Sequence, residues 1–363
     1  PFELVLFNPL GPMSTRTRAT YAFAPASVGN FGPFYDVAGF GLDHLGDIVE
    51  ARPNDTMNEV RLLEIHGPYA DELNATGISL EENNVQQVAN WIWRQYASKT
   101  TKGLDLLLHK FLPLRSGLGS SAASCVAAAK CVLVALGIEE SLTQVAKVEA
   151  AMKGELRNSD FEHLDNILPS YFGGVWNIGD KQFYRVNSPE FTIVAFLDEA
   201  ERKSTFIQRR LVKEHLRHLI EDPNQNQSIE KLLSYFRFFS HSSMRLIQAL
   251  NDGNMKTVGE LINVECDNLL FEARGNSIPR LREMKKTIME AGAYGCSISG
   301  SGPAIFAIVS GQDGAKSLRD KIVERFSDRE LKWLISPLNS YGSKVLRNID
   351  DWYQENRGYH NFW

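Results

Sequence analysis

The sequence lacks a broad excess of positive charge and a long hydrophobic run. The formal net charge is -5, so nucleic acid is not expected as a partner, and an anionic substrate must be held by local cations and main-chain amides. No uninterrupted apolar stretch reaches the roughly 18 residues of a membrane span, and no signal peptide is visible. We therefore expect no membrane partner and a cytoplasmic location.

Cysteine is also scarce, because the chain has only four, Cys125, Cys131, Cys266 and Cys296. They form no C-x-x-C pair and stand in apolar or glycine-rich surroundings. This setting favours reduced thiols in a core over disulfides or zinc ligands.

Several nucleotide-binding signatures are missing as well. The chain has no G-x-x-x-x-G-K-[ST] segment, no complete G-x-G-x-x-G after a strand, no H-R-D loop and no G-x-S-x-G elbow. These absences exclude a P-loop enzyme and a protein kinase.

Strand and helix patterns alternate along the whole chain of 363 residues. Apolar alternation predicts strands, and amphipathic or uniformly apolar longer stretches predict helices. In the first half the expected strands are 17–27, 47–53, 60–67, 103–114 and a hairpin over 173–186, and the expected helices are 83–99, 120 to about 136, and 141–155. In the second half the expected strands are 191–200, a pair within 296–310, and 331–337, and the expected helices are 204–220, 228–251, 255–265, 278–291 and one ending near 326.

The segment NSPE at 187–190 separates the two halves. Because each half mixes strands and helices, the sequence predicts an α+β chain with an N-terminal domain over 13–187 and a C-terminal domain over 188–346. Residues 1–12 resemble a cleavable leader and receive no functional role. For the aromatic tail over 347–363, a docked terminal helix and a disordered extension are both open.

A glycine-rich loop stands directly before the apolar helix of the first half, where the chain reads SGLGSSAAS. Gly117 and Gly119 lack the Cβ atoms that would keep another group away from the main chain, and a helix start leaves amides without intrahelical partners. The helix dipole adds about half a positive charge there. Gly119, Ser120 and Ser121 are therefore suited to hold a phosphate chain, with hydroxyls for phosphate or Mg²⁺. The ordinary alternative is a serine N-cap after a glycine turn.

Three stretches in this order resemble the three motifs of the GHMP kinases: 24–43, 113–124 and 297–308. Further segments resemble the homoserine kinases of that family most closely. They are N-x-G-P-x-x-D in the first motif, H-x-D-N-x-x-P within EHLDNILPSYFGG, and S-T-x-x-x-R in STFIQR. The resemblance covers nearly everything from about residue 18 to residue 345.

The resemblance implies a nucleotide site with Mg²⁺. It assigns Mg²⁺ to Ser121 and to Glu155, which stands eight positions before His163. The implied ATP-binding residues are Asn84, Pro113, Ser116, Gly117, Leu118, Gly119, Ser120 and Ser121. A small hard cation prefers such oxygen ligands, together with phosphates and water.

It also implies an amino-acid site. The implied residues are Asn30, Asp36, His163, Asn166, Thr205, Arg209 and Arg274. Asp36 and Asn30 would bind the α-ammonium group, and the guanidinium groups of Arg209 and Arg274 would bind the α-carboxylate. Taken singly, each also fits an ordinary role, such as a turn former, a helix-end histidine or a solvated basic face.

The sequence departs from the family pattern in two places. Phe34 and Tyr35 stand where homoserine kinases usually carry Gly-Phe, and a bulky residue there would narrow the substrate pocket. Arg274 lies in EARGNSIP, not in the usual E-P-x-R form. The third motif, Ser299–Pro303, is expected to turn tightly beside the first loop, with Ser299 or Ser301 bonding a phosphate or substrate group.

The fold implied by the resemblance is a two-domain GHMP kinase fold. Its N-terminal domain is like ribosomal protein S5 domain 2, and its C-terminal domain is ferredoxin-like. The implied reaction is transfer of the ATP γ-phosphate to L-homoserine, with Ser121, Glu155 and Arg209 as catalytic residues and a homodimer as the assembly. The alternatives are another small-molecule kinase of the family, acting on a sugar or mevalonate-like alcohol, and a ligand-binding regulator without activity.

Overall fold

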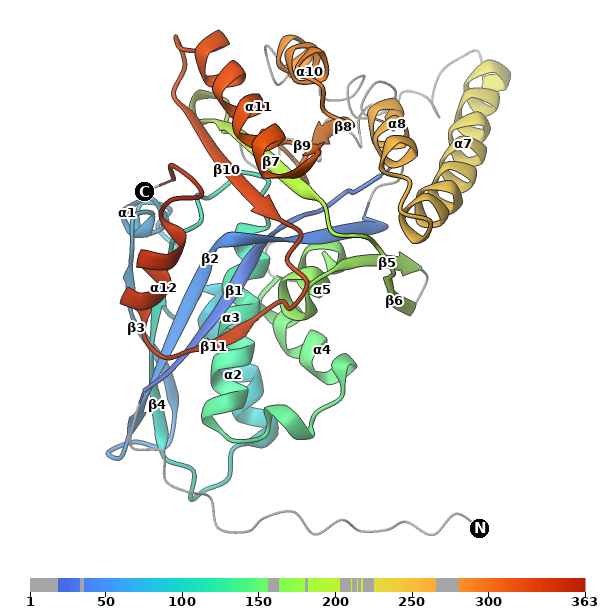
Figure 1. Cartoon of the computed structure of the whole chain (residues 1–363). Coiled ribbons are helices and arrows are strands. Elements are labelled where there is room, and N and C mark those ends of the chain that lie inside the picture. Colours follow the sequence, from blue (N-terminus) through green and yellow to red (C-terminus); the bar gives the residue numbers. More distant parts are fainter. Residues whose placement is uncertain are drawn as a thin grey trace, which may run out of the picture.

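The computed structural model describes residues 19–32, 36–155, 163–179, 182–202, 225–265 and 281–362, together with the single residues 210, 214 and 217. Figure 1 shows two domains, one above the other, each built from a sheet and helices. In this part of the chain no helix is long and apolar enough to cross a membrane. Cys125, Cys131 and Cys296 are buried thiols outside any disulfide, as the sequence predicts, whereas Cys266 lies outside the described residues.

The N-terminal domain is built on a mixed sheet of seven strands in the order β11-β1-β2-β4-β3, with β5 and β6 joined to one end of β2. The strands are β1 (Thr20–Val28), β2 (Ala38–Asn54), β3 (Val60–His66), β4 (Gly103–His109), β5 (Val175–Gly179), β6 (Gln182–Val186) and β11 (Lys344–Leu346). The expected strand over 47–53 is only the second half of β2. Its first half pairs with β5 and is buried on both faces, so apolar alternation could not reveal it.

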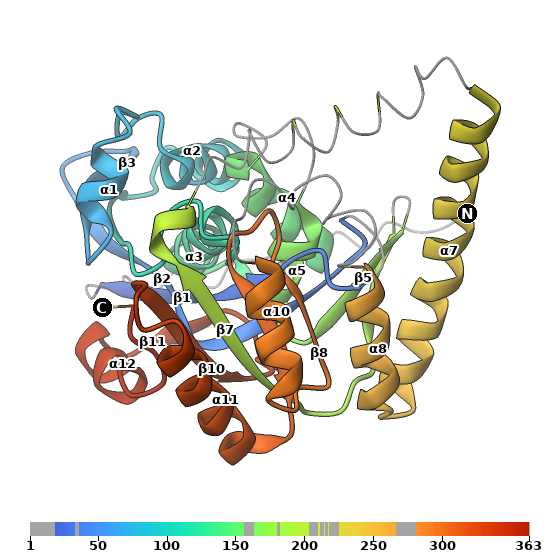
Figure 2. The ribbon, with the colours of Figure 1, turned by 90° about the horizontal axis from the view of Figure 1, so that it is seen from above.

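Helices cover one face of this sheet (Figure 2). They are α2 (Asn84–Tyr96), α3 (Ser120–Ala135), α4 (Gln144–Glu155) and α5 (Leu164–Phe172), and α1 (Ala70–Asn74) follows β3. α3 is apolar on all sides because it lies between the sheet and α2, α4 and α5. It is the central element of the N-terminal core.

The C-terminal domain is built on an antiparallel sheet of four strands in the order β10-β7-β9-β8. Within the domain this is the order fourth, first, third, second, which is the ferredoxin-like arrangement that the resemblance implies. The elements are β7 (Thr192–Asp198), β8 (Gly295–Ile298), β9 (Ile305–Val309), β10 (Leu331–Pro337), α7 (Gln225–Asn251), α8 (Met255–Glu265), α10 (Leu281–Glu290) and α11 (Gly311–Arg325). α10 and α11 pack on one face of the sheet around their own apolar cluster.

An aromatic cluster joins the two domains. Phe306 on β9 packs against Phe40 on β2 with ring centroids 5.5 Å apart, and against Phe31 at 6.2 Å. Phe191, just before β7, contacts Phe40 at 5.5 Å. These four rings belong to one buried cluster that also contains residues of α7 and α8. The domains therefore share a hydrophobic core.

The C-terminal end of the chain returns to the N-terminal domain. β11 lies within the stretch expected to belong to the C-terminal domain, and it pairs with β1 in the large sheet. After β11 comes α12 (Ile349–Asn356), whose Trp352 is 2% exposed and packs on Phe23 and Phe111 at 5.0 and 5.2 Å. Of the two possibilities left open for the tail, the structure supports the docked helix.

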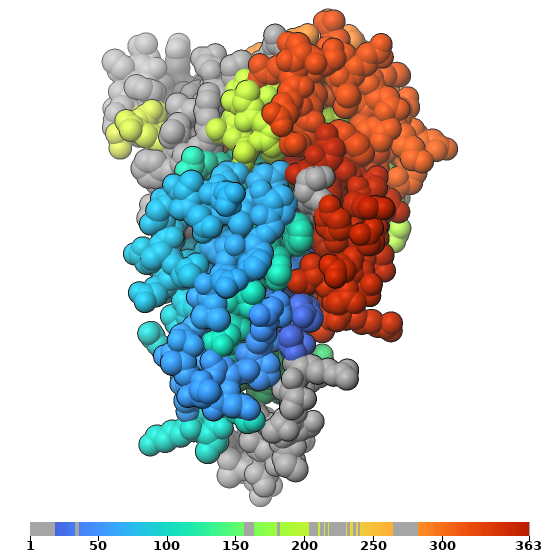
Figure 3. Space-filling model, turned by 90° about the vertical axis from the view of Figure 1, so that its left-hand side faces the viewer, coloured from blue at the N-terminus to red at the C-terminus, as the bar shows by residue number. Residues whose placement is uncertain are grey.

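The last residues of the tail contact both domains. Tyr359 and Asn361 hydrogen bond to the main chain of β10, through Ile335 N to Tyr359 O at 2.8 Å and Asn361 N to Trp333 O at 3.2 Å. On the other side, Tyr69 donates to the carbonyl of Phe362 at 2.9 Å. Figure 3 shows this red segment against the blue N-terminal domain and below the orange-red C-terminal domain.

Candidate active site

A cavity of about 500 Å³ lies at the N-terminal end of α3. Residues from the first motif, the glycine-rich loop, α2, α4, α5 and the third motif all line it. The sequence-predicted residues among them are Asn30, Asp36, Asn84, Ser116, Gly117, Gly119, Ser120, Ser121, Glu155, His163, Asn166 and Ser301. Pro113 and Leu118 are not in this lining, and Leu118 is buried in the interdomain core instead.

The glycine-rich loop ends at Gly119, which is the N-cap of α3 and has a left-handed backbone with φ 67°. No side chain caps the helix, so the serine N-cap that we considered as the ordinary alternative is absent here. Ser120 and Ser121 are instead the first two helical residues. Their main-chain amides therefore belong to the positive end of the helix dipole, at the wall of the cavity.

The third motif packs directly on this loop. The Ser299 hydroxyl donates to the Gly117 carbonyl at 2.7 Å, and Ala304 N donates to the Ser116 carbonyl at 3.0 Å. A Cβ on Gly117 would lie 2.4 Å from the Ser299 carbonyl oxygen, which is why this position requires glycine. The predicted proximity of the two loops is confirmed, and Ser299 fastens them together.

A buried ion pair supports the start of α3 from below. Lys110, 2% exposed, donates to the carboxylate of Asp47, to the Ser120 carbonyl at 3.1 Å and to the Ser124 hydroxyl at 2.9 Å. An ammonium group has three protons, so each is matched by an acceptor. Asp47 also accepts from the main-chain amides of Phe111 and Leu112, both at 3.0 Å. The pair fixes the first turn of α3 against the end of β4.

Ser121, Asn84 and Glu155 line one end of the cavity. The Asn84 amide donates to the Ser121 hydroxyl at 2.7 Å. Glu155 ends α4 and is 4% exposed. Next to it, Gly154 allows close packing, because a Cβ there would lie 2.6 Å from the sulfur of Cys125, one turn after Ser121 on α3. The Glu155 carboxylate acts electrostatically on the Cys125 thiol, and it lines the same cavity as Ser121.

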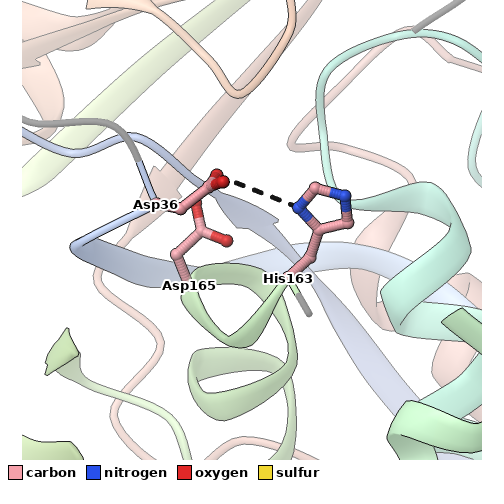
Figure 4. Close-up of side chains that lie close together, drawn as sticks. All are labelled: Asp36, His163 and Asp165. Carbon is pink, nitrogen blue, oxygen red and sulfur yellow. Dashed lines mark ion pairs between the residues drawn. The ribbon is translucent and has the colours of Figure 1, made fainter. Parts of the chain in front are cut away.

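The first motif and the N-terminal end of α5 meet at the other end of the cavity. Asn30 donates through Nδ2 to the Gly300 carbonyl at 2.9 Å and accepts from Asp36 N at 2.8 Å. His163 Nδ1 lies 3.9 Å from Asp36 Oδ1 (Figure 4). Asn166 accepts from the Ser27 hydroxyl at 3.0 Å. The four residues predicted for an amino-acid site in this part of the chain therefore lie together.

Asp165 completes this end of the cavity. One ligand atom from each of Asp36, His163 and Asp165 lies within 4.8 Å of the others. Burial, and then the negative charge of Asp36, raises the pKa of Asp165 to about 8. Two carboxylates facing one another repel, so a cation between them would stabilise both. The set contains an imidazole, whereas Mg²⁺ prefers oxygen ligands, so it suits an ammonium group better than Mg²⁺.

Some predicted residues cannot be placed. Thr205, Arg209 and Arg274, assigned to the amino-acid substrate by the resemblance, lie outside the described residues, and so do Phe34 and Tyr35. Their roles stay predictions.

The sequence analysis assigned no role to three buried ionisable residues, Asp47, Lys110 and Asp165. Lys110 gave a signal, as a lysine between the apolar end of a strand and a proline, whereas Asp47 stands in a strand that also carries Glu50 and Arg52. Asp165 lay within the H-x-D-N segment but received no role. Each is at most 2% exposed, and burial of this kind is not visible in a sequence.

Known protein families match both halves of the chain. The GHMP kinases N terminal domain matches residues 83–174, and the GHMP kinases C terminal family matches residues 246–328. A homoserine kinase of Pyrococcus abyssi is 32% identical over 307 residues, which cover 83% of this chain and 92% of that protein. A homoserine kinase of Arabidopsis thaliana is 31% identical over 90% of this chain and 82% of its own length.

Solved structures have the same fold. The crystal structure of homoserine kinase from Cytophaga hutchinsonii has a TM-score of 0.76 and 26% identity, covering 94% of this chain and all of that one (100%). The L. major mevalonate kinase in complex with R-mevalonate has a TM-score of 0.69 at 15% identity, covering 92% of this chain and 99% of that one. At that identity the second likeness supports the fold alone.

Proposed function

The chain belongs to the GHMP kinase family, and from that premise we propose that it transfers the γ-phosphoryl group of ATP to the side-chain hydroxyl of L-homoserine, giving O-phospho-L-homoserine. One observation carries the proposal: a single cavity holds a glycine-rich loop at a helix N-terminus and, beside it, a cluster of carboxylates, imidazole and amides. Two curated relatives, which are 32% and 31% identical to this chain and come from an archaeon and a plant, are homoserine kinases.

The nucleotide's phosphates would lie against Gly119, Ser120 and Ser121. The support is the uncapped N-terminus of α3, which offers main-chain amides and the positive end of a dipole. The charge of Lys110 lies beneath that turn. Asn84, which the resemblance assigns to the adenine, lines the same cavity and donates to the Ser121 hydroxyl.

Mg²⁺ would be held by Ser121 and Glu155. The donor set fits the ion, since both side chains offer oxygen and both line the cavity. When bound, the ion would neutralise charge on the phosphates during transfer.

The acceptor would occupy the opposite end. Asp36 and Asn30 would receive its ammonium group, while Arg209, Arg274 and Thr205 stay the predicted partners of its carboxylate. Transfer forms a bond from the acceptor oxygen to the γ-phosphorus and breaks the bond from that phosphorus to the bridging oxygen of ADP. The hydroxyl proton passes to water. We assign no side chain as the base that takes this proton, because phosphoryl transfer depends mainly on alignment and charge stabilisation.

An assay of ADP release with L-homoserine, mevalonate, galactose and no acceptor tests the proposal. We expect turnover only with homoserine. The variant Glu155→Gln should lower turnover by at least about a hundredfold while changing homoserine affinity less than about threefold, because the lost charge acts on the phosphates. Comparable loss of both would contradict the metal role.

The other outcomes separate the alternatives. Turnover with mevalonate or galactose instead would indicate another GHMP kinase, and homoserine binding without any ADP release would indicate a regulator. Three further expectations stay proposals: the domain bounds 13–187 and 188–346, a homodimer, and a cytoplasmic location. β11, although within 188–346, belongs to the N-terminal sheet. Light scattering of the purified chain would test the dimer.

A further inference from the structure

We propose that Asp165 is a positioning residue of the acceptor site, which orients Asn30 and Asn166 and shares with Asp36 the negative charge that receives the substrate's ammonium group. This proposal rests on the proposed function. Asp165 is the second residue of α5 and is 1% exposed. A carboxylate so deeply buried is costly unless hydrogen bonds and charge compensate it.

The hydrogen bonds of Asp165 reach both neighbouring segments. Its Oδ2 accepts from the main-chain amide of Asn30 at 2.8 Å, and its Oδ1 accepts from Asn166 Nδ2 at 3.2 Å. Asn30 has a left-handed backbone with φ 55°, a conformation that needs support from its surroundings. The Asp165 carboxylate supplies that support directly.

The orientation of Asn30 then affects the rest of the site. Its side chain accepts from Asp36 N and donates to the Gly300 carbonyl of the third motif. Asp36 is itself left-handed, with φ 58°. Through Asn30, the Asp165 carboxylate therefore links the first motif to α5 and to the third motif of the C-terminal domain.

The chain packs tightly around this carboxylate. A Cβ on Gly29 would lie 2.5 Å from Asp165 Oδ2 and 2.5 Å from Asn166 Nδ2. A Cβ on Gly39 would lie 1.8 Å from the Asp165 carbonyl oxygen. Two glycines thus allow β1, β2 and α5 to meet at Asp165, and a shift of its side chain would move the first motif.

The second part of the proposed role of Asp165 depends on its charge. The titratable groups that face Asp165 in the described chain are Asp36, on the loop before β2, and His163, at the start of α5 (Figure 4). The pKa of Asp165, raised to about 8 by burial and by Asp36, means that it is largely protonated at pH 7. A bound ammonium group favours the ionised form, so binding should release part of a proton, and the affinity should rise as pH rises from 7 toward 8.

The test compares Asp165→Asn with Ser170→Ala in the full chain. The amide introduced by Asp165→Asn can replace only one of the two accepted hydrogen bonds, because its NH₂ group would present protons to the other donor. We expect the KM for homoserine to rise at least about tenfold and the KM for ATP to change less than about twofold. Ser170 is the matched control: it is a buried residue of the same helix whose hydroxyl bonds the Pro25 carbonyl at 2.8 Å, so its loss should change neither KM.

A second measurement needs no variant. Titration calorimetry of homoserine binding to the wild type at pH 7, in buffers of different ionisation enthalpy, should show proton release, and a pH series should show the KM for homoserine falling from pH 7 to 8. Asp165→Asn should show neither effect beyond the ligand's own titration, which both proteins share.

The outcomes separate this inference from the proposed function. Absence of homoserine turnover in the wild type would overturn the proposed function itself. A wild type that uses homoserine, with an Asp165→Asn variant that keeps its KM and its proton release, would overturn the role of Asp165. Equal rises of both KM values would mean that Asp165 only stabilises the fold, and would overturn it too.

Discussion

At the scale of single residues, backbone conformation determines which side chains the site accepts. Asn30 and Asp36 adopt left-handed backbones in the first motif, and Gly117 and Gly119 do so in the loop before α3. The sequence analysis assigned all four to ligand binding from chemistry and resemblance. The structure adds a steric reason for the glycines, since main-chain and side-chain atoms lie where a Cβ would be.

The two ends of α3 allow a direct test of that reason. Gly119 and Gly137 are both left-handed, with φ 67° and 74°, but a Cβ on Gly119 would lie 2.2 Å from the Ser27 hydroxyl oxygen, whereas a Cβ on Gly137 would meet nothing within 4 Å. We expect Gly137→Ala to lower the free energy of unfolding by about 1 kcal/mol through the backbone alone. Gly119→Ala should lower it by at least about 2 kcal/mol and raise the KM for ATP.

Urea unfolding and initial rates would measure both effects. Equal loss of stability in the two variants, with an unchanged KM for ATP, would show that the contact at Gly119 does not matter.

Single residues also show where sequence interpretation ends. The resemblance assigned Glu155 to Mg²⁺ from its spacing to His163; that role stays a prediction, and both residues line the cavity. Lys110 and Asp47, by contrast, are 63 positions apart, and only the pairing of β2 with β4 brings them together. Because this ion pair forms only in the tertiary structure, no characteristic spacing along the chain predicts it.

At the scale of elements, the sequence predicted most helices and strands whose apolar residues recur with a helical or strand period. α2, α3, α4, β3 and the β5–β6 hairpin are confirmed within a few residues. β11 was missed because a strand of three residues is too short for a pattern, and α12 was left open because its partners Phe23 and Phe111 are remote in sequence. Docking of the tail depends on those partners and not on helix propensity.

The tail should loosen in acid because of His360. Burial, and then the neighbouring His44, lowers the pKa of His360 from 6.5 to about 4. Because His360 is harder to protonate in the docked state than in the undocked state, docking is most favourable above about pH 6.5. This contribution to the free energy of docking is lost as the pH falls toward 4. We expect amide exchange in residues 349–362, corrected for intrinsic rates, to speed up between pH 6.5 and 5.

A matched pair of variants isolates the histidine. His360→Asn should flatten the pH dependence, since the amide does not titrate, whereas His66→Asn, on the exposed end of β3, should leave it unchanged. Persistence of the full pH dependence in His360→Asn would assign the effect to another group.

At the scale of the whole molecule, the two halves separated by NSPE are two sheets with a shared interior. The sequence analysis predicted the α+β class, and the resemblance implied the two domain types, both of which are confirmed. The interdomain cluster was not foreseen, because its four phenylalanines look like ordinary core residues of their own halves of the chain. They are Phe31, Phe40, Phe191 and Phe306. The site depends on that cluster, since its lining comes from both domains.

A shared core makes the two domains unfold together. Ile305 on β9 faces the cluster of α10 and α11, whereas its neighbour Phe306 faces the N-terminal domain. Ile305→Val removes one methyl group from the C-terminal core and should cost about 1 kcal/mol. If unfolding is one cooperative transition, protection against amide exchange should fall by the same factor, about fivefold, in α3 as in α11.

The control is Val323→Ala, on the exposed side of α11, which should leave the amide protection of both helices unchanged. Faster exchange in α11 with unchanged exchange in α3 would mean that the domains open independently, and the cavity between them would then be lost before the N-terminal domain unfolds.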